Sequence, residues 1–132
     1  MKRALISRVR RDDRGALTLS YVAVLPFLFL FIMVLIQASF WFLAREAALA
    51  SARQGADAAR ALNASRGAGP AAALAFAHQA GNGYLLDPVA RSGGTTATTI
   101  SITVSGHAPS FVPGLVVRVT ETAQAPIEVF RS

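Results

Sequence analysis

The chain has 132 residues, with 13 lysines and arginines against 7 aspartates and glutamates, and therefore a formal net charge of +6. It contains no cysteine, which excludes disulfides, thiolate metal sites and a cysteine nucleophile. Six of the basic residues lie within the first 14 positions, directly ahead of an apolar run. This distribution is typical of the cytoplasmic flank of a membrane span, so we expect the membrane as a partner and no nucleic acid.

The apolar run extends from Tyr21 to Leu43 and contains no charged residue. As a helix it would be about 34 Å long, against about 30 Å for the hydrocarbon core of a bilayer. A cleaved secretory signal has a shorter apolar core of about 7–15 residues, so we favour an anchor over that alternative. With the basic flank inside, the run predicts a single-pass protein of the cytoplasmic membrane whose C-terminal domain lies outside.

The junction ahead of the run reads Asp13-Arg14-Gly15-Ala16. It looks like the leader junction of type IV pilin-like proteins, which a prepilin peptidase cuts after a glycine. Glycine lacks a Cβ, so an extended backbone can enter a protease cleft at this position. The junction therefore predicts cleavage between Gly15 and Ala16.

More specifically, residues 13–61 resemble the TadE-like family of the tight-adherence (Flp) pilus assembly system. Members combine a basic leader, a Gly-x-x-x-x-Glu-Tyr-like junction, a long apolar helix with an early proline, and an alanine-rich extension. The resemblance implies a pseudopilin that acts structurally in assembling adhesive pili. Its implied partners are other pilin-like subunits, the assembly platform and the prepilin peptidase. The matching elements here are Gly15, Ser20-Tyr21, Pro26 and the sequence ALASARQGADAAR from Ala48 to Arg60.

One position departs from the family pattern. After a cut behind Gly15, Ser20 takes the fifth place, where pilin-like proteins usually carry a glutamate. That glutamate is thought to pair with the amino terminus of a neighbouring subunit, and a serine hydroxyl cannot neutralise such a charge. We therefore expect an accessory subunit and not the main fibre protein. The alternative is an uncleaved, membrane-anchored envelope scaffold or binding module unrelated to pili.

Three polar or irregular residues interrupt the run. Pro26 cannot donate to the helical hydrogen-bond ladder and predicts a kink. Gln37 and Ser39 can hydrogen-bond either to a partner helix in the membrane or to nearby backbone.

Residues 44–62 have high helix propensity and no proline, which predicts that the span continues as a helical stalk. Small side chains recur along this stalk at helical spacing and allow two helix backbones to approach closely. Two interpretations stay open: the stripe packs on the chain's own domain, or it receives a helix of another subunit. Under the second, Gly55→Leu weakens partner association and leaves membrane insertion intact. The small-residue stripe consists of Ala44, Ala48, Ala52, Gly55 and Ala59.

Residues 64–132 predict a small extracytoplasmic domain. A glycine-rich break precedes a short helix from Pro70 to Ala80, with Leu74, Phe76, Leu85 and Leu86 as core candidates. Alternation predicts two antiparallel strands, in TTISITVSGH and GLVVRVTETAQ, joined by the loop APSFVPG. Their expected apolar faces are Ile100, Ile102 and Val104, and Leu115, Val117 and Val119.

The closing PIEVF either extends the sheet edge or packs Ile127 and Phe130 on the domain. The predicted fold class is therefore α+β, with a long membrane-spanning helix and stalk, a short helix and a small antiparallel sheet. The predicted organisation is a basic cytoplasmic leader at 1–15, the span and stalk at 16–63, and the extracytoplasmic domain at 64–132.

No catalytic constellation stands out in the sequence. His78 and His107 are the only histidines, and no cluster with metal-ligand spacing surrounds either of them. The chain has no G-x-S-x-G motif, and the stretch from Ser92 to Thr96 lacks the lysine of a phosphate-binding loop. We therefore expect neither an enzyme nor a bound cofactor or metal.

Overall fold

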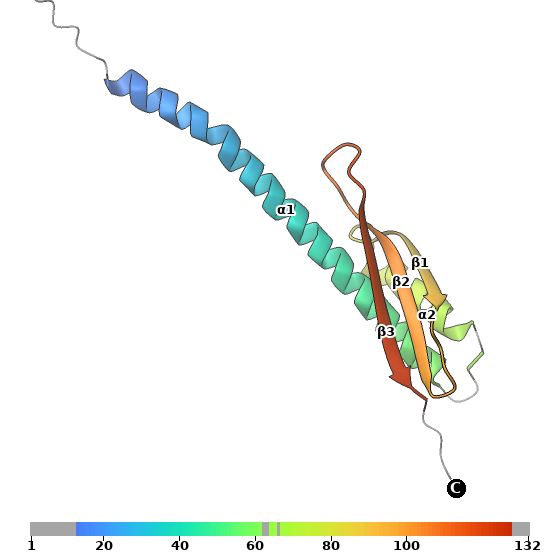
Figure 1. Ribbon diagram of the computed structural model, residues 1–132. Coiled ribbons are helices and arrows are strands. Elements are labelled where there is room, and N and C mark those ends of the chain that lie inside the picture. Colours follow the sequence, from blue (N-terminus) through green and yellow to red (C-terminus); the bar gives the residue numbers. More distant parts are fainter. Residues whose placement is uncertain (1–12, 62–63, 66, 128–132) are drawn as a thin grey trace, which may run out of the picture. The chain divides into compact units, whose positions relative to one another are not determined.

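The computed structural model describes residues 13–61, 64–65 and 67–127. Within them the chain is α+β, as predicted, with one long apolar helix, a short helix and a three-stranded antiparallel sheet (Figure 1). Most of the predicted leader and Phe130 lie outside the described residues. In chain order the elements are α1 (Asp13–Ala59), α2 (Ala68–Ala80), β1 (Leu86–Ser92), β2 (Thr99–Ala108) and β3 (Val117–Pro126).

Helix α1 contains the apolar run and most of the alanine-rich stalk, and Pro26 lies inside it. The helix continues through this proline, and the predicted kink there stays a prediction. The chain divides into two compact units, Met1–Leu35 and Ile36–Ser132, so the second half of α1 belongs to the same unit as the sheet. This assignment follows from side-chain packing, because the stalk carries much of that unit's core.

The sheet has the strand order β1-β2-β3, with β2 pairing antiparallel to both neighbours. Ile100, Ile102 and Val104 on β2 are buried, which confirms the predicted apolar face of this strand. On β3, Val119 is buried and Val117 packs against the core, whereas Leu115 precedes the strand and is exposed. The predicted pattern is thus correct for β3 only from Val117 onward.

Strand β1 was not predicted, because its sequence LDPVARS contains a proline and no apolar alternation. The register between β1 and β2 shifts between Leu86 and Val89. Asp87 has a φ of 48°, and Pro88 follows it without an N–H to donate. An irregular pairing of this kind is where a strand tolerates proline.

Two helical segments, the second half of α1 and α2, form one layer against one face of the sheet (Figure 1). The helices contribute mainly alanines to the core, and the sheet contributes Ile102, Val104 and Val119. Gly55 on α1 and Gly69 on α2 mark the closest approach. A Cβ added at Gly55 would lie 2.7 Å from both the Ala73 Cβ and the Gly69 carbonyl oxygen. Small residues are therefore required here because the two helix backbones nearly touch.

The small-residue stripe thus has its partner inside the same unit. Ala44, Ala48 and Ala52 are fully buried, Gly55 is buried, and Ala59 packs against the core. Of the two interpretations given above, the structure shows the internal one. These side chains offer no surface to a helix of another subunit, because α2 and the sheet already cover them.

Candidate functional site

The most unusual surface of the described residues is the apolar part of α1. Between Tyr21 and Leu35, twelve large apolar side chains are exposed, from 43% for Ile32 to 76% for Phe27. The most apolar 18-residue window of the helix from Ser20 has a mean hydropathy of 2.5, and none of it is buried. Exposure extends around the whole helix and is not limited to one face. By length and composition this helix can cross a membrane.

The residues of the predicted processing junction lie at the start of α1. Gly15 and Ala16 have helical backbone, because α1 begins at Asp13. Ser20 and Tyr21 are exposed, and Pro26 follows within the same helix. A protease that requires an extended backbone would have to unwind this first turn, which a glycine facilitates.

Gln37 joins the apolar run to the loop between β2 and β3. Its side-chain Nε2 donates to the Pro109 carbonyl oxygen at 3.0 Å, and its Oε1 accepts from the Phe111 N–H at 3.3 Å. Of the two possibilities for Gln37, a partner helix or backbone, the structure shows backbone hydrogen bonds. The amide group of Gln37 thus donates one hydrogen bond and accepts another, and both partners are backbone groups of one loop of the same chain.

Aromatic rings surround the same junction. The Phe40 ring lies 5.4 Å from that of Phe111 in an edge-on arrangement, and 6.1 Å from that of Tyr84. Such pairs add roughly 0.5–1.5 kcal/mol beyond the area they bury. We call the set Gln37, Phe40, Tyr84, Pro109 and Phe111 the collar. It could not be recognised in the sequence, because its members come from three separate segments.

A second link to α1 lies about two turns further along the helix. The Arg45 Nε and the Glu121 Oε1 on β3 are 2.6 Å apart. The Arg45 guanidinium also lies 5.7 Å from the centre of the Trp41 ring, a distance that permits a cation–π interaction. Arg45 is the first charged residue after the apolar run. The apolar run is therefore followed closely by a residue that forms an ion pair with the sheet.

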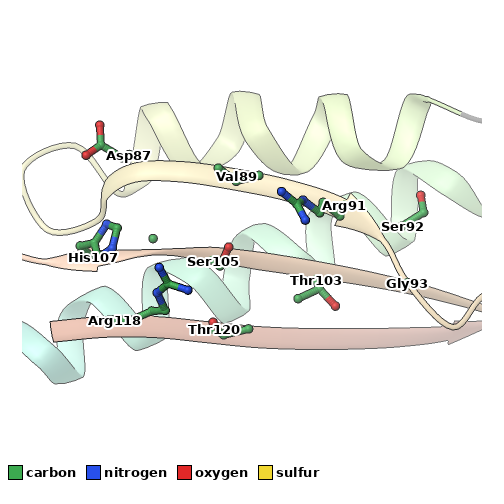
Figure 2. A pocket seen from close by; sticks show the side chains of 11 residues that line it. Asp87, Val89, Arg91, Ser92, Gly93, Thr103, Ser105, His107, Arg118 and Thr120 are labelled. Atoms are coloured by element: carbon green, nitrogen blue, oxygen red, sulfur yellow. The ribbon is translucent and has the colours of Figure 1, made fainter. Parts of the chain in front are cut away.

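The outer face of the sheet carries an open depression of about 480 Å³ (Figure 2). Its basic side chains come from all three strands: Arg91 from β1, His107 from β2 and Arg118 from β3. His107 and Arg118 are opposite each other in the β2–β3 register. Threonine and serine hydroxyls line much of the remainder. Asp87 also lines the depression, so two arginines and a histidine share it with one carboxylate, and the open surface does not enclose a small molecule.

The two histidines lie on different elements, His78 exposed in the last turn of α2 and His107 on β2. Among the described residues, no group of three or more histidines and carboxylates is arranged to hold a metal ion. The expectations that the protein is not an enzyme and binds no cofactor remain predictions.

Comparisons of the chain with protein-family models, with curated proteins and with solved structures found no match. The resemblance to the TadE-like family therefore rests on the quoted residues alone.

Proposed function

We propose that the protein is a single-pass, pilin-like membrane protein that acts structurally as an accessory subunit in pilus assembly. The observation that carries the membrane part is the exposure of large apolar side chains all around α1 between Tyr21 and Leu35. The pilin-like part rests on the sequence at Gly15, Ser20-Tyr21 and Pro26.

Energetics support a membrane for the apolar run. Burying one large apolar side chain fully is worth roughly 1.5–3 kcal/mol. The twelve exposed side chains retain about half of their surface, so covering them all is worth on the order of 10–20 kcal/mol. That equals or exceeds the whole stability of a typical domain, about 5–15 kcal/mol. A helix of this composition is therefore stable only where something apolar surrounds it.

Charge supports the orientation. The cluster of basic residues ahead of Gly15 favours the cytoplasmic side, since positively charged flanks are retained there. The part of the unit Ile36–Ser132 that follows the apolar run then lies outside the cytoplasmic membrane. It would present its sheet to other pilin-like subunits or to the assembly platform, with the depression at Arg91, His107 and Arg118 on the outer face of that sheet.

The processing step is tested by the mass and the N-terminal sequence of the membrane-extracted protein, produced with and without a prepilin peptidase. We expect a start at Ala16 only when the peptidase is present. Gly15→Leu is the matched variant, because it leaves the apolar run unchanged and should retain the leader. A native chain that keeps residues 1–15 in the presence of the active peptidase would contradict the pilin-like route.

Ser20 favours one alternative, an uncleaved envelope scaffold anchored by the same helix. Without a glutamate at this place, a freed amino terminus would lack its usual partner within low-dielectric surroundings. The scaffold predicts a retained leader and no co-purification with pilus assembly proteins. The same mass measurement, combined with affinity purification of the full chain, separates the two functions.

A further inference from the structure

We propose that the loop between β2 and β3, residues 109–116, enters the outer interface of the bilayer that α1 spans. The protein would then contact the membrane at two places, the helix and this loop. The inference rests on the proposed membrane span, and the experiment below distinguishes failure of the loop from failure of the span.

The side chains of the loop are those of a membrane contact. Residues 109–116 include no charged residue. Four of their apolar side chains are exposed to solvent. The exposed fraction is 57% for Phe111 and 70% for Val116, and Val112 and Leu115 are also exposed. Four neighbouring apolar side chains on one loop are costly in water, whereas the interface of a bilayer accepts aromatic and aliphatic groups.

The loop is also fixed beside the apolar run. Gln37 bonds to the loop backbone at both Pro109 and Phe111, and the Phe40 ring contacts the Phe111 ring. Gln37 and Phe40 are themselves part of the uncharged run that ends at Leu43. A bilayer that covers this run therefore has its boundary next to the loop.

Several backbone polar groups of the loop form hydrogen bonds within the loop, which lowers the cost of removing them from water. The Val112 N–H donates to the Ser110 hydroxyl at 3.2 Å, and that hydroxyl lies 3.3 Å from the Val112 carbonyl oxygen, to which it donates in turn. The Leu115 N–H donates to the same carbonyl at 3.1 Å. Pro109 and Pro113 have no N–H to satisfy. Unpaired backbone groups are what normally keeps a loop out of a membrane, and here several of them are paired within the loop.

Lipid accounts for the loop better than a protein partner does. Protein interfaces usually add a polar rim to an apolar centre, whereas this loop offers Ser110 as its only polar side chain, and that hydroxyl is engaged within the loop. Among the neighbouring ionisable side chains, Asp87 and His107 line the depression at the base of the loop, and Arg45 and Glu121 pair with each other. A second copy of the chain seated on the loop would shield the same side chains, and the experiment below distinguishes it from lipid.

Because the chain has no cysteine, a single introduced cysteine is labelled specifically, and its depth in the bilayer can be measured. Four single-cysteine variants of the full chain carry a nitroxide label in vesicles of phosphatidylcholine and phosphatidylglycerol. Val112→Cys and Val116→Cys report on the loop, and Leu30→Cys reports on the span. Ala97→Cys lies in the exposed β1–β2 connection and is the aqueous control. Collision with oxygen reports lipid, and collision with a water-soluble nickel complex reports solvent.

We expect nickel accessibility at 112 and 116 to be several-fold lower than at 97, with oxygen accessibility raised, and the deepest signal at 30. Labels at 112 and 116 that behave like the label at 97, while the label at 30 is in lipid, would overturn the loop contact and leave the span intact. A solvent-exposed label at 30 would reject the span and the inference together. Protection at 112 that disappears when the protein-to-lipid ratio is lowered would assign the loop to a second copy and also overturn the proposal.

Discussion

Helix α1 contains two apolar segments that differ in the size of their side chains and in what covers them. From Tyr21 to Leu35 the residues are mostly phenylalanine, leucine, valine and isoleucine, and twelve of the large apolar ones are exposed, while Met33 is partly buried. From Ala44 to Ala56 the inward-facing residues are mostly alanine and are buried. Small side chains here indicate a neighbouring backbone in the same chain, whereas large ones on all sides indicate a surrounding medium.

The largest effect is expected from introducing charged residues into the first segment, which tests whether lipid surrounds it. The double variant Leu28→Arg, Leu30→Arg should lose membrane association, because each arginine near the centre of a span costs about 2.5–3.5 kcal/mol. The measurement is the fraction of full-length protein that stays with the membrane pellet after an alkaline wash. Leu28→Ala, Leu30→Ala is the control and should remain in the pellet. Retention of the doubly charged chain would mean that the segment is not embedded in lipid.

The second segment is tested at its tightest point. Gly55→Leu should destabilise the folded unit by about 3 kcal/mol, because its side chain would collide with Ala73 and with the backbone of Gly69. Thermal unfolding of the detergent-solubilised chain measures the change. Gly67→Leu is the control, since a Cβ at Gly67 meets nothing within 4 Å. If Gly55→Leu left stability unchanged but abolished partner binding, the stripe would serve another subunit after all.

The collar residues of α1, Gln37 and Phe40, lie between the two segments in the sequence, and a change there should give a smaller effect. Gln37→Leu removes two hydrogen bonds to the loop, each worth about 0.5–1.5 kcal/mol. We expect faster hydrogen exchange at the Phe111 amide, which loses its acceptor. Gln54→Leu, at an exposed position of the same helix, should leave that amide unchanged. Equal exchange in both variants would show that Gln37 does not hold the loop.

The smallest expected effect concerns the ion pair to the sheet. Arg45→Met keeps an unbranched side chain and should cost at most about 1 kcal/mol, because the arginine is substantially exposed and solvent screens the pair. The loss should shrink at high salt. Glu46→Gln, on the exposed side of the helix, serves as control in the same denaturation series. A salt-independent loss in Arg45→Met would point to packing against Trp41 instead.

Periodicity predicted much of the fold. The short helix was expected from Pro70 and begins at Ala68, and the apolar face of β2 was identified residue by residue. Both elements have the regular spacing of buried positions that a helix or a half-buried strand requires. Ile127 packs against the core, in agreement with one of the two interpretations of the C-terminal segment.

The features that sequence did not reveal depend on long-range contacts. Strand β1 pairs with β2 despite Pro88, and its sequence has no alternation of apolar residues that would predict a strand. Leu115 and Val116 continue the alternation of β3 in sequence, yet they belong to the loop, where Gly114 with its φ of 79° turns the chain. Gln37 was recognised as a hydrogen-bonding residue, but its partner lies 72 positions away. The tertiary fold decides which residue each side chain contacts, and the local sequence does not contain this information.

The irregular pairing at Asp87 and Pro88 also affects how copies of this protein can coexist. In the proposed membrane location, copies are confined to two dimensions and meet often, and the free edge of a small sheet can recruit a strand from another molecule. Strand β1 is such an edge, since among the described residues it pairs with β2 alone. The proline removes one donor from it, and the register shift disrupts its regular spacing. This end of the sheet is thereby protected against unplanned growth into an aggregate.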